Sequence, residues 1–366
     1  MPTGIKEITN YLEEIAPLHY QEAYDNSGLI VGDENTEVST ALITIDCTEK
    51  VIDEAIAQNC NLIITHHPIV FEGLKRFNGN NYVERTVIKA IKYGIAIYAI
   101  HTNLDNVHNG VSAKIAEKLG LENCKVLAPK SDLLRQLVVY CPTDNSADLK
   151  TALFAVGAGK IGDYENCSFS SVGKGTFIAG KEASPHIGKI GEIHTEHENR
   201  IEVIYPKYKE RAVLNAMQNN HPYEVVAHQI YALDNNHQLV GSGIIGELKK
   251  PIKSKLFLES IKTNMQTDCI RHTSLVKAEI KKVAVCGGSG SFLLNNAKAA
   301  CADIFITADF KYHQFFDAEN DIIIADIGHY ESEQFTKDLI YDLLTKNFTK
   351  FAVQLSKVNT NPINYL

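Results

Sequence analysis

The chain has 366 residues, of which 45% are hydrophobic and 22% are charged, with 36 Lys and Arg against 44 Asp and Glu. This composition is typical of a folded globular protein and excludes a disordered, collagenous or coiled-coil chain. The length corresponds to two or three domains. The net charge of −8 argues against a protein that grips nucleic acid through its whole surface, because phosphate binding needs a basic footprint, so we do not expect a nucleic-acid partner.

The cysteines and the N-terminal segment indicate the cellular compartment of the protein. No two of the eight cysteines lie three residues apart, so the sequence contains neither a thiolate zinc motif nor a thioredoxin-like motif. Residues 1–17 have the pattern of an amphipathic helix rather than of a signal peptide. The sequence contains no apolar run near the roughly 18 residues that a membrane span needs. We therefore expect a soluble, cytoplasmic protein without a membrane partner.

The first third of the chain alternates short apolar runs with segments of helical periodicity. Continuous β-branched runs separated by helices indicate a parallel sheet that is covered on both faces. The predicted strands are 41–46, 61–65 and 95–100, and the predicted helices are 51–56, 83–91 and 111–119.

The middle of the chain has a different pattern. The elements follow the order β-α-β-β-α-β, which is that of a ferredoxin-like unit. The predicted strands are 134–141, 171–179, 200–205 and 223–231, and the predicted helices are 147–156 and 213–217. We expect an inserted α+β domain at 131–239 within a discontinuous α/β domain formed by 1–130 and 240–366.

The last third returns to the α/β pattern, either as a second lobe or as the other half of one sheet. The predicted strands are 281–286, 303–308 and 321–327, and the predicted helices are 291–300 and a closing helix through 335–343.

Candidate metal ligands follow three of the predicted strands. In open parallel sheets ligands bind beyond the carboxyl ends of the strands, so these side chains are expected at one edge of the fold. Neighbouring side chains on an extended backbone point apart, so adjacent histidines reach two ions more easily than one. The candidates are His66 and His67, Asp105, and His329 with Glu333, which share a helix face at the start of the predicted closing helix.

Three imidazoles and two carboxylates suit two divalent ions held about 3.5–4 Å apart. Two carboxylates leave two of the four positive charges uncompensated, which favours a bound hydroxide and an anionic substrate. The number of ligands leaves coordination positions open, as in catalytic sites. Nitrogen and carboxylate ligands without thiolate suit zinc foremost, and also iron, manganese or cobalt. A lone histidine at such a place is more often a loop or core residue, so the prediction depends on the combination.

Two further segments allow more than one interpretation. The loop 286–290 opens a predicted helix and has a backbone suited to anions. It matches neither a dinucleotide fingerprint nor a Walker loop, and a tight strand-to-helix turn explains it equally well. Asp309, Lys311 and His313 either support ligands or substrate, or belong to a solvated loop.

Six segments form a distinctive combination: THHP (65–68), HTNLDN (101–106), CGGSG (286–290), TADFKYH (307–313), IGHYESE (327–333) and TNPINYL (360–366). Together they resemble the Nif-three-like family, whose members are often described as GTP cyclohydrolase I type 2 homologues. The middle of the chain is similar to the PII/CutA-like insertion of longer bacterial members. One segment, HPYEVVAHQIY (221–231), departs from this insertion, for which a sequence similar to HPYEEPAYDIY is expected.

The resemblance implies a two-lobed, three-layer α/β/α fold with a dinuclear metal site in the cleft between the lobes. It also implies assembly into a toroidal homohexamer. It assigns His66, His67, Asp105, His329 and Glu333 as ligands, with Glu333 bridging the two ions.

We expect a metal-dependent hydrolase that acts on a nucleotide or another phosphorylated or purine-like small molecule. GTP ring opening and phosphoester hydrolysis are two versions of this reaction, and His101 or His313 is the candidate general acid. The alternative is a non-catalytic regulatory or metal-handling ring protein whose PII-like insert binds an effector. A ring that threads DNA is disfavoured by the net charge.

Overall fold

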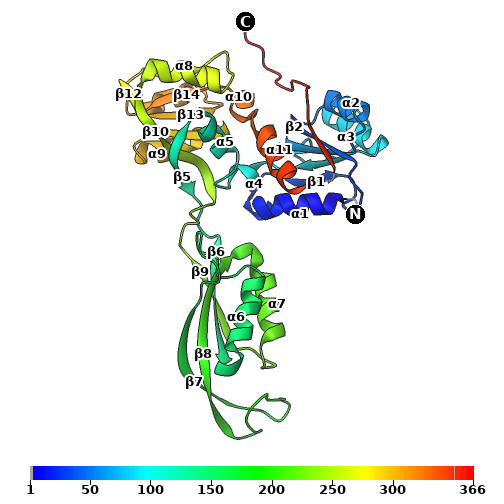
Figure 1. Cartoon of the computed structure of the whole chain (residues 1–366), viewed down its shortest axis with the longest axis vertical. Helices are drawn as coiled ribbons and strands as arrows, with labels where there is room; N and C mark the ends of the chain where they lie inside the picture. The colour runs from blue at the N-terminus through cyan, green and yellow to red at the C-terminus, as the bar shows by residue number, and fades with distance from the viewer. Residues whose placement is uncertain (1–2, 350) are drawn as a thin grey trace. The chain divides into compact units, whose positions relative to one another are not determined.

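The computed structural model describes residues 3–349 and 351–366. The chain forms two compact units, of which the first comprises Met1–Ala128 and Leu239–Leu366 and the second Pro129–Gln238. The two sheets of the first unit lie in separate lobes (Figure 1). None of the helices in the described part of the chain combines the length and apolar character that crossing a membrane requires.

The first lobe is built on a five-stranded sheet with the order β1-β4-β3-β2-β15. Four strands are parallel, and β1 runs antiparallel to β4 at the edge. The strands are β1 (Gly28–Val31), β2 (Thr40–Asp46), β3 (Leu62–His67), β4 (Ala96–Ala99) and β15 (Ala352–Leu355). The strands predicted at 41–46, 61–65 and 95–100 are confirmed.

Helices cover both faces of this sheet because alternate strand residues are apolar on both sides. Ile43 and Leu62 pack into one core cluster with α1 (Ile5–Ile15) and α11 (Thr336–Asn347). Leu42 and Ile63 pack into the other with α2 (Glu49–Ala57) and α3 (Tyr82–Lys92). Short helices η1 (Leu18–Tyr20) and α4 (Thr102–Asp105) complete the lobe.

The second lobe is a separate six-stranded sheet with the order β11-β14-β13-β12-β10-β5, which decides between the two alternatives for the last third. Its centre, β12-β13-β14, is parallel, whereas β10 pairs antiparallel with β12 and β11 pairs antiparallel with β14, so this lobe is a mixed sheet. The strands are β5 (Leu121–Pro129), β10 (Gly241–Lys253), β11 (Arg271–His272), β12 (Glu279–Ser289), β13 (Ile304–Ala308) and β14 (Ile323–Asp326).

Helices also cover both faces of the second sheet. One core cluster joins the sheet to α5 (Val111–Lys118) and α8 (Ser254–Asn264). The other joins it to η4 (Ser291–Leu293), α9 (Leu294–Ala299) and η5 (Tyr312–Ala318). The predicted closing helix is interrupted, since α10 (His329–Glu333) is a separate short helix before α11.

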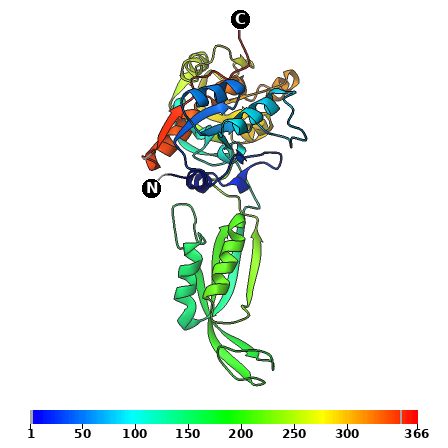
Figure 2. The same cartoon turned by 90° about the vertical axis from the view of Figure 1, so that its right-hand side faces the viewer.

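The second unit is a four-stranded antiparallel sheet with the order β7-β8-β6-β9 and two helices side by side on one face (Figures 1 and 2). Its β-α-β-β-α-β element order is ferredoxin-like. A core of its own joins the helices to the sheet through Leu137, Leu153, Val203 and Met217. The elements are β6 (Leu134–Pro142), η2 (Thr143–Asn145), α6 (Ser146–Ala155), β7 (Phe169–Ile178), β8 (Ile193–Pro206), η3 (Lys207–Lys209), α7 (Glu210–Asn220) and β9 (His228–Leu233).

The last strand of this unit begins five residues later than predicted. The sequence predicts a strand at 223–231, but β9 starts at His228. The preceding segment is held in a turn instead, because the Tyr223 N–H donates to Nδ1 of His221 (3.1 Å) and His221 Nε2 contacts the Tyr140 carbonyl (2.9 Å).

Candidate metal centre

A cavity of about 640 Å³ is lined by residues from both lobes of the first unit. His67 ends β3, Asp105 ends α4 directly after β4, and His329 and Glu333 lie on α10 after β14. All four line the cavity, whereas His66 lies behind its wall and is fully buried. The carboxyl ends of the strands therefore bring together residues that are far apart in the sequence.

The Glu333 carboxylate lies at the centre of this group. Its Oε1 is 3.8 Å from Nε2 of His66, and its Oε2 is 2.9 Å from Nε2 of His67 and 3.2 Å from Nε2 of His329. Asp105 Oδ1 is 3.7 Å from Nε2 of His66. The ligand atoms of His66, His67 and Glu333 all lie within 4.8 Å of one another, so these three residues can hold a metal ion.

Two buried polar atoms of this group have no hydrogen-bond partner among the described residues, namely His66 Nε2 and Asp105 Oδ1. Leaving such an atom unsatisfied costs about 1–3 kcal/mol. Both atoms point at the same place, since they are 3.7 Å apart. A cation between them would satisfy both, so the donor set fits a metal.

Each ligand histidine is held by a partner behind it. Nδ1 of His66 lies 2.8 Å from the Ile100 carbonyl, that of His67 lies 2.8 Å from Asp46, and that of His329 lies 2.7 Å from Asp309. Such contacts select the tautomer and ring orientation that aim Nε2 at a metal. Of the two interpretations left open for Asp309, the structure favours contact with a candidate ligand, since Asp309 holds the ring of His329.

Sequence reasoning did not identify Asp46 as part of the site. It is the last residue of the predicted strand 41–46, so its place at a strand end was a signal that could have found it. Thr360 and Pro362 of the C-terminal segment also line the cavity, and Thr360 Oγ1 donates to Asp46 Oδ2 (2.6 Å).

The charged side chains of this group shift one another's pKa values. Burial alone would lower the pKa of His67, but the Glu333 and Asp46 carboxylates raise it to about 10. Burial is likewise outweighed at His329, where Glu333 and Asp309 raise the pKa to about 11. Burial would raise the pKa of Glu333, but His329 and His67 hold it well below its usual range.

Asp105 behaves differently from Glu333. Burial raises the pKa of Asp105, with a further contribution from the nearby Glu333 charge and against the opposing effect of His66. Without a metal ion, the charged form of Asp105 is therefore disfavoured. A divalent cation would relieve the repulsion between these two carboxylates.

The structure separates the two candidate general acids. His101 lines the cavity, its ring centroid lies 5.3 Å from those of His66 and His67, and its Nδ1 is 2.7 Å from Asp25. His313 is exposed on η5 and is not among the residues that line the cavity. The prediction of His313 as a general acid therefore lacks geometric support, because its ring is not at the site.

The glycine-rich loop closes against Glu333. The Gly288 N–H donates to Ser332 Oγ (2.9 Å), and the Gly287 N–H donates to Ser112 Oγ (3.4 Å). A Cβ atom on Gly288, whose φ is +59°, would lie 2.3 Å from Glu333 Oε1. The loop is thus a close approach of backbone to the Glu333 carboxylate, and the amides of Gly287 and Gly288 are engaged by serine hydroxyls rather than free to bind an anion.

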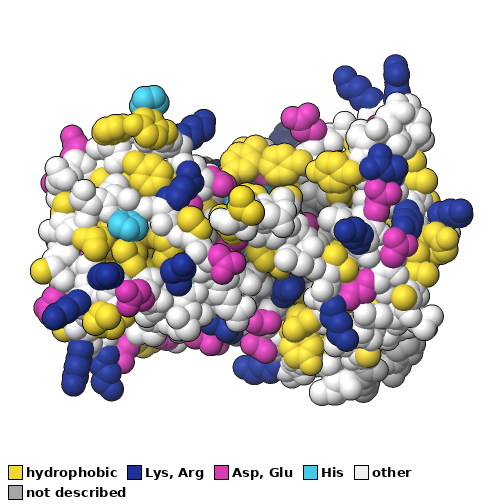
Figure 3. Space-filling model, turned by 90° about the horizontal axis from the view of Figure 1, so that it is seen from above, with side chains coloured by type: hydrophobic (Ala, Val, Ile, Leu, Met, Phe, Trp, Pro, Cys, Tyr) yellow, Lys and Arg dark blue, Asp and Glu magenta, His cyan; other side chains and the backbone are white. Residues whose placement is uncertain are grey.

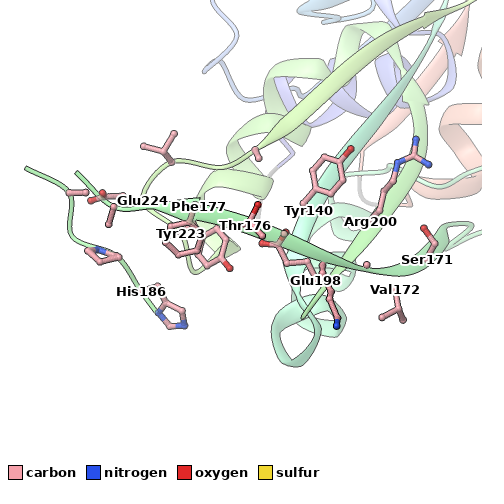
Figure 4. Close-up of a pocket in the computed structure, with 18 residues that line it drawn as sticks. Tyr140, Ser171, Val172, Thr176, Phe177, His186, Glu198, Arg200, Tyr223 and Glu224 are labelled. Atoms are coloured by element: carbon pink, nitrogen blue, oxygen red, sulfur yellow. The ribbon is translucent and has the colours of Figure 1, made fainter. Parts of the chain in front are cut away.

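The second unit contains a cavity of its own of about 580 Å³ (Figure 4). Tyr140, Phe177 and Tyr223 contribute aromatic rings to it, and Glu198 and Arg200 contribute charged groups. The Tyr223 hydroxyl is buried, and its pKa is raised by burial and by Glu198.

Metal binding is predicted to release protons. His67 and His329 are protonated at neutral pH in the metal-free protein because their pKa values are raised, and a metal competes for the same nitrogen atoms. Between pH 6.5 and 8.5, affinity for zinc should rise by up to about tenfold per pH unit for each proton displaced. Calorimetry in buffers of different ionisation enthalpy measures this release, and a heat that is independent of the buffer would contradict the prediction.

Gly288→Ala should reduce metal binding by displacing Glu333. The matched control is Gly120→Ala, because Gly120 also has a positive φ of +68° but a Cβ there meets nothing within 4 Å. Both variants should lose about 1 kcal/mol or more of folding stability from backbone strain. Only Gly288→Ala should lose zinc in elemental analysis, and equal zinc content in the two variants would refute this role for the loop.

Comparison with known proteins identifies the family and supports the fold. A family model described as Duf34/NIF3 (NGG1p interacting factor 3) matches residues 3–362. The chain is 38% identical over 367 residues to a Bacillus subtilis (strain 168) protein named GTP cyclohydrolase 1 type 2 homolog, covering 99% of this chain and 98% of that protein. It is 34% identical over 365 residues to a Staphylococcus epidermidis protein of the same name, covering 99% of both.

A solved structure shows the same fold over the whole chain. The crystal structure of a Bacillus cereus protein related to NIF3 has a TM-score of 0.86 and 35% sequence identity, with 100% of both chains covered. The resemblance inferred from the six sequence segments is thereby confirmed. The chain belongs to the Duf34/NIF3 family.

Proposed function

We propose that this chain is a dinuclear metal-dependent hydrolase that acts on a nucleotide or another phosphorylated small molecule. The proposal depends on the position of the Glu333 carboxylate, whose two oxygen atoms lie near different candidate ligands. Oε1 lies 3.8 Å from Nε2 of His66, which in turn lies 3.7 Å from Asp105 Oδ1, whereas Oε2 lies 2.9 Å from Nε2 of His67 and 3.2 Å from Nε2 of His329. This arrangement supports one ion on each side, with Glu333 as the bridge between them.

The charges of the site favour an anionic substrate. Two divalent ions would carry four positive charges against the two candidate ligand carboxylates Asp105 and Glu333, and the more distant Asp46 and Asp309 would offset only part of the remainder because the histidines lie between them and the ions. When bound, the ions would lower the pKa of a water molecule and polarise the bond to be broken. The backing carboxylates Asp46 and Asp309 hold the histidines in place without occupying ligand positions.

His101 is the residue proposed to transfer a proton at this site. Its Nδ1 is engaged by Asp25, which leaves Nε2 as the ring nitrogen for exchange with a substrate. The hydrogen bonds from His101, Thr102 and Asn26 lower the pKa of Asp25 although burial alone would raise it, so this carboxylate stays charged and orients the ring.

We also propose zinc as the resident ion, with iron, manganese or cobalt as alternatives, since the ligands are nitrogen and carboxylate atoms. Assembly into a toroidal homohexamer in the cytoplasm belongs to the same proposal and rests on family membership. On the face seen in Figure 3, Lys and Arg side chains are interspersed with Asp and Glu, which agrees with a small-molecule ligand rather than nucleic acid.

A nucleotide panel tests the catalytic proposal. Zinc-loaded protein should hydrolyse or ring-open at least one member of a panel that includes GTP and phosphomonoesters. His66→Ala and Glu333→Gln should lower that rate by about 100-fold or more, because each removes a ligand or leaves a buried group unpaired. His313→Ala is the matched control and should keep the full rate, and equal rates in all variants would refute the proposal.

A second candidate function is regulation through the second unit, which we propose to be PII/CutA-like. Its cavity of about 580 Å³, with three aromatic rings beside Arg200 and Glu198, has the size and mixed polarity of an effector site. In this case the bound metal ions would be sensed or stored by the protein, or would have a structural role.

Hydrogen exchange separates the regulatory function from the catalytic one. If the unit binds an effector, ATP or GTP should protect β7 and β8 from exchange, and Arg200→Ala together with Tyr223→Ala should abolish that protection. Binding without turnover would then favour the regulatory function. Protection confined to β3, α4 and α10 would contradict it.

A further inference from the structure

Four aromatic side chains line the metal-centre cavity while remaining open to solvent. They are Tyr24, Phe71, Tyr82 and Phe292, which are 65%, 47%, 60% and 66% exposed. Large apolar side chains gathered around one concavity mark a binding site more often than chance exposure does. Metal binding does not account for the position of these rings, because none of the four side chains carries the nitrogen or carboxylate atoms of the candidate ligand set.

Two of these rings form a row that leads to the metal centre. The centroids of Tyr24 and Phe71 are 6.1 Å apart, with ring planes inclined by 34°. Phe71 lies 6.2 Å from the ring of His101, and His101 lies 5.3 Å from that of His67. Aromatic surface is thus continuous from solvent to a metal ligand.

We propose that Tyr24 and Phe71 form a stacking subsite for a planar heteroaromatic ring of the purine type, carried by the molecule whose reacting group lies at the metal centre. This inference rests on the proposed hydrolase function and names the substrate class. A cavity of about 640 Å³ lies within the 300–1,000 Å³ range of small-molecule sites. Stacking of a base on an aromatic side chain contributes about 1–3 kcal/mol.

Three polar side chains of the cavity wall, Glu22, Asn106 and Ser242, are engaged with one another. The Asn106 side-chain amide donates to Glu22 Oε1 (2.9 Å) and accepts from Ser242 Oγ (3.0 Å). Side chains paired in this way offer little to the edge of a base. The proposed subsite therefore contacts the face of the ring rather than the polar groups at its edge. For this reason guanosine and adenosine should bind with similar affinity.

A small ligand explains the rings better than a protein partner does. The rings belong to the wall of a concave cavity, and one of them, Phe71, lies 6.2 Å from the ring of His101, the proposed proton-transfer residue. A docking surface for a protein would not need a row of rings directed at a metal ligand.

Calorimetric titration of the zinc-loaded full chain with guanosine tests the subsite without relying on turnover. Phe71→Leu and Tyr24→Leu keep apolar bulk but remove the ring, and each should weaken guanosine binding by about 5- to 100-fold. Phe71→Tyr should retain binding. Phe316→Ala is the matched control, because Phe316 is 65% exposed but is not among the residues that line this cavity.

Zinc content and binding of ribose 5-phosphate, which lacks a base, should be the same in all these variants. Absence of guanosine binding, or binding that is indifferent to Phe71→Leu and Tyr24→Leu, would overturn the subsite. If nucleotides are hydrolysed but kcat/KM is unchanged by Phe71→Leu, the subsite is wrong and the hydrolase function stands. If binding depends on both rings but no nucleotide is hydrolysed, the subsite stands and the hydrolase function is wrong.

Discussion

The buried carboxylate of Glu333 is the constraint on which the arrangement of the first unit depends. Its side chain is 3% exposed, and a charge removed from water in this way costs several kcal/mol unless it is paired. Three imidazoles from two lobes supply the pairing. The lobes must therefore meet so that the end of β3 faces α10, and the backbone at Gly288 must come close enough that no side chain fits there.

The partners behind the histidines extend this constraint outward. Asp46 and Asp309 hold the rings of His67 and His329, and Thr360 in turn holds Asp46. Each candidate ligand histidine is thus held by a partner from another segment of the first unit, and for His67 the hydrogen bonds extend through Asp46 to Thr360. Metal sites depend on such supporting contacts almost as strongly as on the ligands.

Much of this architecture could be predicted from sequence because it follows from local patterns. Buried parallel strands such as 41–46 are apolar except at Thr44 and at the final residue, Asp46, so their limits are visible. β10 was missed because its burial alternates and then fades over 241–253, and its role as an antiparallel neighbour of β12 depends on contacts far along the chain. The break between α10 and α11 leaves no Gly or Pro in the sequence to mark it.

The site was partly predictable for a similar reason. Residues at the carboxyl ends of strands were found by position, which placed His66, His67 and Asp105 in one group. Sequence could not distinguish His101 from His313, since both follow strands and only the fold shows which ring enters the cavity. Nor could it assign the loop at Gly288, because a close approach of backbone to carboxylate is a property of two distant segments.

The separation of the ligands along the chain has a consequence for when the centre forms during synthesis. His67 and Glu333 are 266 residues apart, and the whole second unit lies between them. A ribosome that has released the pair His66 and His67 must still make the inserted unit and most of the second lobe before Glu333 emerges. The nascent protein therefore passes through a long interval with only His66, His67 and Asp105 of the candidate site, and all five candidate ligands can meet only in the finished fold.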